Sequence, residues 1–573
     1  AELFLRLLYS ALVDADSLDT EHHWRPEVSA RRGRRTTMDD LWQRFNDDQR
    51  SFTQGDGISE QSEAVRDVRN AVYHDCLAAA ESPTGLFRLN VPTGGGKTRS
   101  GMAFALRHAL RNQQQRIIVA VPFITITEQT AETYRGIFER TTDPVPVVLE
   151  HHSGAQQSGD DEDFQERAVW NRLAAENWDA PIVVTTTVQL FESLFSNMRG
   201  KSRKLHRLAN SVIILDEVQA LPATLLDPIL HALRELCEHY GTTVVLSTAT
   251  QPAFDAVPVF NTLPAADIVQ NAGQYYDRLR RVTYEWRTDP KLGWADVVGL
   301  IRPEEQALAV LNTKADALAL LDALDDRDAL HLSTLLCGAH RREVITKVRS
   351  RLRNGEPCRL VSTQVIEAGV DLDFPLVLRA LGPLDAIIQS AGRCNREGRL
   401  ERGRVIVFEP QMMRLPKGSY QRATGVTQSL VNRGNLDPDD PRIVDTYFRQ
   451  WFDLEPTDDH LIQPLRQALD YPRVAEEFRM IEPSENVIIT SYGTVDDQRR
   501  VLRYLDELRR GTPQSRILLR ELQPYMVSLP VYQAEFYRSR QLISPILPGI
   551  GEWHGRYDER RGIVAETGEA YII

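Results

Sequence analysis

The stretch LNVPTGGGKTRS, Leu89 to Ser100, decides the first domain of this sequence. An apolar run that ends in FRLNV leads into it, and the amphipathic segment TRSGMAFALRHAL follows. A Gly-rich turn between a strand and a helix directs consecutive backbone N–H groups and a helix N-terminus at one anion. The stretch therefore predicts a phosphate-binding loop.

The residues of this loop have separate predicted roles. Lys97 is expected to reach the β and γ phosphates of ATP, and the Thr98 hydroxyl to ligate Mg²⁺. The pattern GxxxxGK[ST] is only partly met, because Val91 stands where its first glycine would be. Three consecutive glycines followed directly by Lys-Thr still favour a phosphate loop over a chance turn. The predicted nucleotide-binding residues here are Thr93, Gly94, Gly95, Gly96, Lys97 and Thr98.

A second motif, which contains two acidic residues, supports the interpretation of the Gly-rich stretch as a phosphate-binding loop. The apolar run IILDEVQ ends in Asp216 and Glu217, followed by Gln219. Asp216 suits Mg²⁺ coordination, and Glu217 can polarise the water that attacks the γ-phosphorus. The alternative, an acidic pair that caps a helix after a strand, is common in isolation but leaves the loop unexplained.

The wider pattern alternates short β-branched runs with longer amphipathic segments, which is typical of parallel sheets covered by helices. The first set comprises RIIVAVP, PIVVTTT, SVIILDE and TTVVLSTAT, and the second comprises ALAVLNT, CRLVSTQ, LVLRAL and RVIVFEP. We therefore predict an α/β chain with two tandem parallel-sheet domains. The stretch between the two sets, roughly Phe260 to Ile301, has few periodic apolar runs.

The predicted domain boundaries follow from these runs. After Pro410 the composition turns to Arg, Asp, Pro and Gln with helical patterns, which indicates an accessory domain. The predicted segments are 1–60 (amino-terminal segment and linker), 61–275 (first domain), 276–412 (second domain) and 413–573 (linker and accessory domain).

Composition restricts the class of protein. No apolar run reaches the roughly 18 residues of a membrane helix, and the five cysteines form no CxxC pair, so we expect a cytoplasmic protein that does not contact membranes. The net charge of −12 argues against a generally basic nucleic-acid coat. The basic runs Ser29 to Arg35 and Met198 to Leu208 are only supporting evidence for nucleic-acid binding, because such runs are more often solvated faces of loops or helices.

The motifs, in their order along both domains, resemble a superfamily 2 helicase, which implies two tandem RecA-like parallel-sheet domains. VPFITITEQT and TTTVQLFESL are similar to its DNA-contacting motifs, DEVQ to its Walker B motif, and LSTATQP to its coupling motif. VSTQVIEAGVDLDF and QSAGRCNREGR resemble the motifs of the second domain that close on ATP. The resemblance implies arginine fingers at Arg393 and Arg396, whose spacing predicts one helical face. It also implies nucleotide contacts by Gly369, Asp371 and Gln389.

EHHSG (150–154), DEVQALP, STATQP and STQVIEAGVDLDF together resemble the helicase-nuclease of type I CRISPR systems, most closely its type I-C form. The resemblance implies 3′ to 5′ translocation on single-stranded DNA, recruitment by a crRNA-guided surveillance complex, and a monomer. Backbone phosphates of the DNA are expected near Thr125, Gln129, His152, Thr187 and Thr363, although Thr in such loops often caps a helix. An RNA helicase and an ATP-dependent switch without turnover are the alternatives.

The amino end, LLYSALVDADSLDTE (Leu7 to Glu21), is similar to the closing helix of that family's HD nuclease domain. The resemblance implies a metal ligand at Asp14 or Asp16 and, in a complete domain, a site for Mn, Co, Ni or Fe. The upstream histidines are missing, and His74-Asp75 is interpreted as a chance pair. The resemblance therefore makes residues 1–60 the remnant of an HD nuclease domain with a linker, and we expect no DNA cleavage by this chain.

Overall fold

The computed structural model describes residues 1–33, 36–54, 63–143, 145–152, 162–257, 264–367, 369–434, 436–511 and 515–564. Contacts divide the chain into two compact units, Ala1–Arg280 with Asp437–Met480, and Arg281–Leu436 with Ile481–Ile573. Each unit contains a parallel sheet with helices, so the predicted pair of α/β domains is confirmed.

The sheet of the first unit carries the phosphate loop. Within the described residues its order is β3-β4-β2-β5-β6-β1-β7, and its neighbours pair in parallel. β2 and β4 are buried along their whole length, as expected for strands covered on both faces. The strands are β1 (Leu86–Asn90), β2 (Ile117–Val121), β3 (Val148–His151), β4 (Ile182–Thr186), β5 (Val212–Asp216), β6 (Thr243–Thr248) and β7 (Ala266–Asp267).

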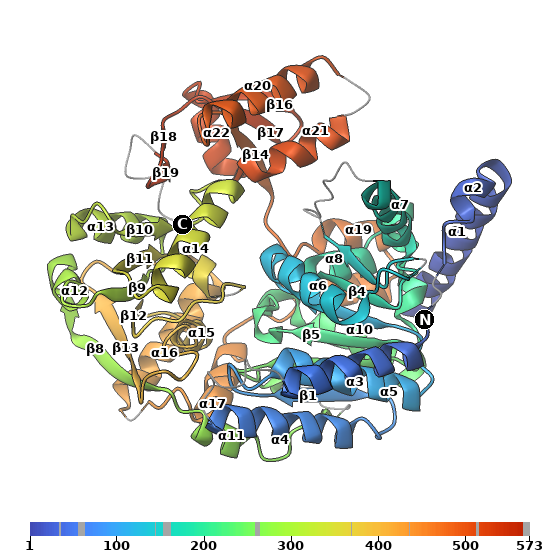
Figure 1. Cartoon of the computed structure of the whole chain (residues 1–573), viewed down its shortest axis with the longest axis horizontal. Helices are drawn as coiled ribbons and strands as arrows, with labels where there is room; N and C mark the ends of the chain where they lie inside the picture. Colours follow the sequence, from blue (N-terminus) through green and yellow to red (C-terminus); the bar gives the residue numbers. More distant parts are fainter. Residues whose placement is uncertain are drawn as a thin grey trace. The chain divides into compact units, whose positions relative to one another are not determined.

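Helices α3, α4 and α5 pack together against one core of this sheet (Figure 1). Helix α1 lies beside the short elements α9 and η2 (Leu205–Leu208), which contain the basic run that ends at Leu208. The helices before the chain leaves this unit are α1 (Glu2–Trp24), α2 (Pro26–Ser29), α3 (Met38–Gln54), α4 (Glu63–Ala79), α5 (Lys97–Arg111), α6 (Ile124–Phe138), α7 (Glu162–Asn177), α8 (Thr187–Leu194), α9 (Arg199–Ser202), α10 (Leu226–His239) and α11 (Ala272–Arg278).

The second unit contains a parallel sheet of order β10-β11-β9-β12-β13-β8 in its described residues. Its first strand, β8, falls in the stretch where the sequence shows few periodic apolar runs. β8 is an edge strand that pairs only with β13 in the described part of the sheet, so it tolerates polar residues on its open side. The strands are β8 (Val282–Leu292), β9 (Gln306–Val310), β10 (Leu330–Leu332), β11 (Cys358–Ser362), β12 (Leu376–Ala380) and β13 (Gly403–Pro410).

The helices of this part are α12 (Trp294–Ile301), α13 (Lys314–Leu324), α14 (Gly338–Arg353), α15 (Leu384–Ala391) and α16 (Ser419–Asn432). A smaller sheet of order β15-β14-β17-β16 follows and shares a hydrophobic core with the parallel sheet. Its elements are β14 (Ser484–Ile489), α20 (Val495–Arg509), α21 (Ser515–Leu522), β15 (Met526–Pro530), α22 (Val531–Ser539), β16 (Ile543–Leu547) and β17 (Ile550–Trp553), before the ladder β18 (Tyr557–Asp558) and β19 (Gly562–Ile563).

The segment after residue 413 is divided between the two units, whereas the sequence predicts one accessory domain. The helices α17 (Pro441–Phe452), α18 (Ile462–Gln467) and α19 (Tyr471–Glu477) belong to the first unit. All five cysteines are buried and free. Among the described helices, none combines the length and the apolar character that crossing a bilayer requires.

Candidate nucleotide-binding site

The phosphate loop joins β1 to α5, as the sequence predicts. Gly94 and Gly96 have φ of 83° and 84°, in the left-handed region where a side chain is strained. A Cβ on Gly95 would lie 2.6 Å from Val91 Cγ1, so this position has no room for a side chain. Arg69 of α4 donates from Nε to the Gly94 carbonyl at 2.9 Å. Steric and conformational limits therefore account for the three glycines.

The structure brings two of the predicted catalytic side chains, Lys97 and Glu217, together with Asp216 at the carboxyl ends of β1 and β5. Lys97 Nζ donates to Glu217 Oε1 at 2.6 Å and lies 3.4 Å from Asp216 Oδ1. Burial alone would lower the pKa of Lys97, but the carboxylates of Asp216 and Glu217 outweigh burial and raise that pKa. Lys97 is therefore a cation held between two anions.

Neighbouring side chains orient these carboxylates. Ser247 donates to Asp216 Oδ1 at 2.8 Å, and Gln219 Nε2 donates to Glu217 Oε2 at 2.6 Å. The Thr248 hydroxyl donates to Gln219 Oε1. Ser247 and Thr248 lie in the LSTATQP stretch, which resembles a coupling motif in the sequence. The sequence did not predict that Ser247 would bond to Asp216 or that Thr248 would bond to Gln219.

The oxygen donors at this site fit Mg²⁺. Thr98 is the second residue of α5, next to Lys97, and Asp216 is the last residue of β5. Hydroxyl and carboxylate oxygens are ligands that Mg²⁺ takes together with phosphate oxygens. Thr98 and Asp216 are therefore the residues that would hold the ion.

The candidate residues of the second unit lie on the loop after β11, in α15 and on the loop after α15. Arg396 Nε pairs with Asp371 Oδ1 at 2.8 Å, whereas Arg393 is buried and donates to the carbonyls of Ile366 and Glu367 at 3.1 and 2.6 Å. Gly369 has φ of 74°, and Gln389 lies in α15.

The expectation that Arg393 and Arg396 share a helical face is wrong. α15 ends at Ala391, Cys394 forms a β-bridge with Phe374, and Asn395 has φ of 47°. A bridge and a left-handed residue between the two arginines break the helical repeat.

The predicted nucleic-acid contacts differ in exposure. Thr125 and Gln129 are exposed one turn apart on α6, where both can reach a ligand. His152, Thr187 and Thr363 are buried. His152 Nε2 lies 2.8 Å from Glu150 Oε1, and residues 153 and 154 of the quoted EHHSG lie outside the described residues.

The helix α8 begins at Thr187, and it is Thr186 whose side chain accepts the capping hydrogen bond from the Gln189 N–H at 3.0 Å. The hydroxyl of Thr187 is therefore not used as the cap.

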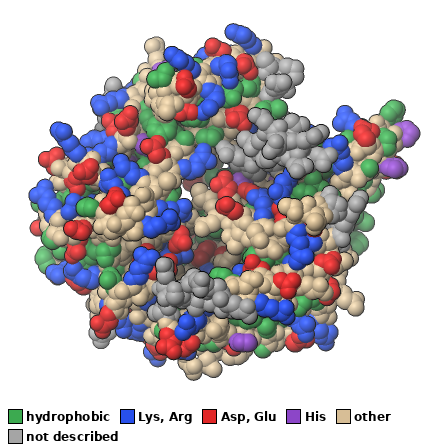
Figure 2. All heavy atoms as spheres, in the orientation of Figure 1, with side chains coloured by type: hydrophobic (Ala, Val, Ile, Leu, Met, Phe, Trp, Pro, Cys, Tyr) green, Lys and Arg blue, Asp and Glu red, His purple; other side chains and the backbone are tan. Residues whose placement is uncertain are grey.

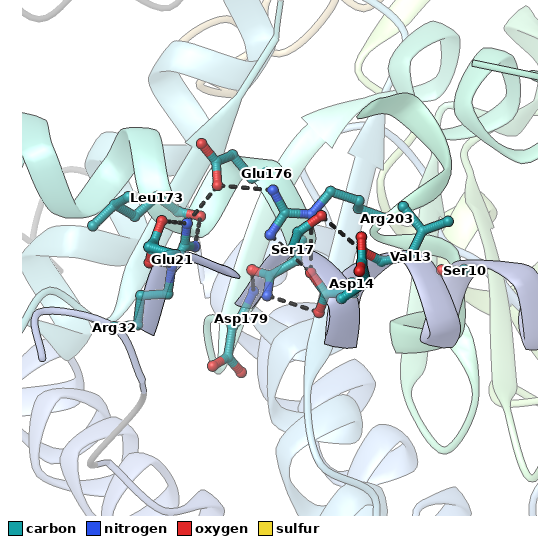
Figure 3. A network of polar contacts seen from close by, with 12 residues as sticks. Ser10, Val13, Asp14, Ser17, Glu21, Arg32, Leu173, Glu176, Asp179 and Arg203 are labelled. Atoms are coloured by element: carbon teal, nitrogen blue, oxygen red, sulfur yellow. Dashed lines mark hydrogen bonds and ion pairs between the residues drawn. The ribbon is translucent and has the colours of Figure 1, made fainter. Parts of the chain in front are cut away.

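Asp14 does not fit the metal role that the resemblance implies. Figure 3 shows its carboxylate facing Arg203, which in turn reaches Glu176. Arg203 and Asn177 each donate to Asp14 at 3.0 Å, and Arg207 lies within 4.0 Å. Cations and an amide donor surround this carboxylate, so a divalent ion would be repelled there.

Asp16 is exposed and pairs with Arg199. No group of three or more His, Cys, Asp or Glu side chains within the described ranges could hold a metal ion. Asp14 therefore fastens α1 to the segment between α9 and η2 through Arg203. Two arginines of the basic run, Arg199 and Arg203, pair with carboxylates of α1.

Comparisons with known proteins agree with this architecture. Residues 56–253 match the family model of the type III restriction enzyme res subunit, and residues 303–399 match the model of the CRISPR-associated nuclease/helicase Cas3, C-terminal. The CRISPR-associated nuclease/helicase Cas3 of Haloferax volcanii is 27% identical, over 61% of this chain and 49% of the relative. The chain thus spans about half the length of the curated relatives it matches.

Two solved structures share the fold. The crystal structure of T. fusca Cas3-AMPPNP has a TM-score of 0.60 and 18% identity, covering 86% of this chain and 68% of that chain. A chain from a CRISPR RNA-guided surveillance complex, pre-nicking, has a TM-score of 0.51 and 15% identity, over 86% and 68% of the two chains. The fold and the two family models are similar to those of superfamily 2 helicases. More narrowly, the family models, the curated relatives and the fold support a Cas3-like helicase of that superfamily.

Proposed function

We propose that this chain is an ATP-hydrolysing motor that translocates 3′ to 5′ on single-stranded DNA in CRISPR interference. The observation that carries the proposal is the cluster of Lys97, Asp216 and Glu217 at the carboxyl edge of the first sheet. The curated relatives are named CRISPR-associated nuclease/helicase Cas3, which supports the proposed biological role.

The loop residues bind and orient ATP. Backbone N–H groups of the glycine turn face the phosphates, and Lys97 offsets their charge. Thr98 and Asp216 would hold a Mg²⁺ ion, which would supply positive charge against the charge that develops on the phosphates. The phosphates compete with Glu217 for the Lys97 ammonium, since both are anionic partners of the same group. Glu217, once displaced, can accept a proton from the attacking water, with Gln219 holding its second oxygen.

Single-stranded DNA is the proposed track, and its contacts are to backbone phosphates rather than base edges. Thr125 and Gln129 are the candidates with exposed side chains. Positive and negative side chains are interspersed on the face shown in Figure 2, in line with the net charge of −12. A local groove rather than a general basic coat would then bind the strand.

Recruitment by a crRNA-guided surveillance complex is part of the proposal. It is supported by the structural neighbour that comes from a CRISPR RNA-guided surveillance complex. We propose no DNA cleavage by this chain, because Asp14 is occupied by Arg203 and Asn177.

The test measures phosphate release from ATP and Mg²⁺ without nucleic acid, with single-stranded DNA, and with single-stranded RNA of the same sequence. We expect DNA to stimulate turnover, RNA to stimulate it little, and Lys97→Ala to abolish it. Preferential stimulation by RNA would favour an RNA helicase, and a single turnover per protein would favour an ATP switch.

Polarity is tested by displacement of streptavidin from DNA biotinylated at either end, with faster displacement expected from the 5′ end. The same preparation with Mn²⁺, Co²⁺ or Ni²⁺ is expected to leave single-stranded DNA intact. Nicking that disappears in Asp16→Ala would restore a nuclease role.

A further inference from the structure

The short helix α11 contacts the loops of the candidate ATP site, although no sequence motif marks it. Tyr276 donates from its hydroxyl to Asn90 Oδ1 at 2.6 Å and also contacts the Ala249 carbonyl. Asn90 is the last residue of β1, directly before the phosphate loop, and Ala249 follows β6 in the LSTATQP stretch. One hydroxyl therefore joins the segments that carry two separate motifs.

Leu279, just after α11, packs against the phosphate loop itself. Its side chain is buried, and its Cδ1 lies 3.7 Å from the position that a Cβ on Gly95 would take. The segment from Tyr276 to Leu279 thus contacts the loop from one side, while Arg69 holds the Gly94 carbonyl through a hydrogen bond.

A continuous series of hydrogen bonds runs from these segments to Glu217. The Val91 N–H donates to the Thr248 carbonyl at 3.2 Å, next to Ala249. The Thr248 hydroxyl donates to Gln219, and Gln219 donates to Glu217 at 2.6 Å. These hydrogen bonds connect the segment around Ala249 to the carboxylate that is proposed to activate water.

The helix α11 is fastened to the first unit by further contacts. Tyr275 donates to Asp75 Oδ2 at 2.8 Å, and Arg278 pairs with Asp67 at 3.1 Å, both on α4. Arg280 pairs with Asp437 at 2.8 Å. The next residue, Arg281, begins the second unit. α11 is therefore the last helix of the first unit before the chain enters the second.

The surroundings keep the Tyr276 hydroxyl a hydrogen-bond donor. Burial raises its pKa, and the nearby carboxylates of Asp439 and Glu217 raise it further. The phenol thus remains protonated at neutral pH.

From this geometry we propose that Tyr276 is a positioning residue for ATP hydrolysis. It holds the Asn90 and Ala249 segments in register, so that the hydrogen bonds ending at Glu217 keep this carboxylate aligned. Through α11 it also ties that alignment to the segment that leads into the second domain. The inference rests on the proposed ATPase function.

The test compares Tyr276→Phe with Tyr275→Phe, a matched control on the same helix whose hydroxyl bonds to α4 instead. Losing the Tyr276 hydroxyl leaves two acceptors without this donor, so we expect kcat to fall about tenfold with KM for ATP within about twofold. The stimulation by single-stranded DNA, as a ratio to basal turnover, should also fall. Tyr275→Phe is expected to keep wild-type turnover and stimulation.

Asn90→Ala and the double variant provide a second measurement. If the two residues act as one unit, the effects on kcat should be less than additive. Two outcomes would overturn the inference: wild-type kcat and DNA stimulation in Tyr276→Phe, or equal losses in Tyr275→Phe. Neither outcome would affect the ATPase proposal, provided that the wild type is active and Lys97→Ala is inactive. No turnover by the wild type would overturn the proposed function itself. Should Tyr276→Phe melt early, unaltered kcat in Asn90→Ala would still count against the positioning role.

Discussion

Replacing Asp14 by alanine distinguishes an anchor for α1 from a metal ligand. The Asp14 side chain is 3% exposed, that of Arg203 is 13% exposed, and their ion pair measures 3.0 Å. Removing one member of a buried pair leaves the other charge uncompensated, at a cost of about 3 to 5 kcal/mol. Arg203 keeps a second contact with Glu176 at 3.1 Å. We therefore expect a loss at the low end, about 3 kcal/mol, in the free energy of unfolding.

Asp16→Ala is the matched control, two residues away on the same helix. Its ion pair with Arg199 joins side chains that are 62% and 59% exposed, and pairs of this kind contribute only about 0 to 1 kcal/mol. Urea unfolding followed by circular dichroism measures both variants, and thermal melting is repeated with MnCl₂. Equal effects of the two substitutions would refute the anchor. So would a melting temperature that Mn²⁺ raises in the wild type but not in Asp14→Ala.

Four further predictions concern the residues that the sequence predicts to be catalytic. Lys97→Ala should abolish ATP turnover while circular dichroism stays unchanged, because the phosphates lose their ammonium partner; retained turnover would refute the loop assignment. Glu217→Gln should bind ATP but hydrolyse it at least 100-fold more slowly, the lower range for a lost general base, as single-turnover kinetics would measure. Arg396→Ala should lower kcat more than KM, as expected for an arginine finger; a change in KM alone would mean ground-state binding. Arg393→Ala should instead lower the melting temperature, because its guanidinium holds two carbonyls of its own domain.

The phosphate loop and its carboxylates could be predicted because their geometry is encoded locally. A strand, a glycine turn and a helix follow one another within Leu86–Arg111, and β5 delivers Asp216 to the same sheet edge. Parallel strands align their carboxyl ends, so two separate motifs meet without further information. Both parallel sheets follow from the same runs of buried β-branched residues.

Other parts of the site depend on contacts between residues far apart in the chain. Asp14 looks like a metal ligand by its motif, yet its partners Asn177 and Arg203 are more than 160 positions away. Tyr276 belongs to no sequence motif. Its role depends on the folded chain, in which its hydroxyl contacts Asn90 at the end of β1 and Ala249 after β6. The assignment of helices α17 to α19 to the first unit is likewise set by packing, since a helical pattern does not specify which core it covers.

The contact between Lys97 and Glu217 connects binding to chemistry at this site. The same 2.6 Å hydrogen bond that stabilises the lysine charge also occupies the proposed base. In the proposed mechanism, ATP would replace Glu217 as the partner of Lys97 before Glu217 takes a proton, so that binding would precede activation. A glutamine at position 217 is a weaker competitor for the ammonium than a carboxylate, because it carries no charge. Glu217→Gln should accordingly bind ATP at least as tightly as the wild type while failing in hydrolysis, whereas a residue that only stabilised the fold would weaken both.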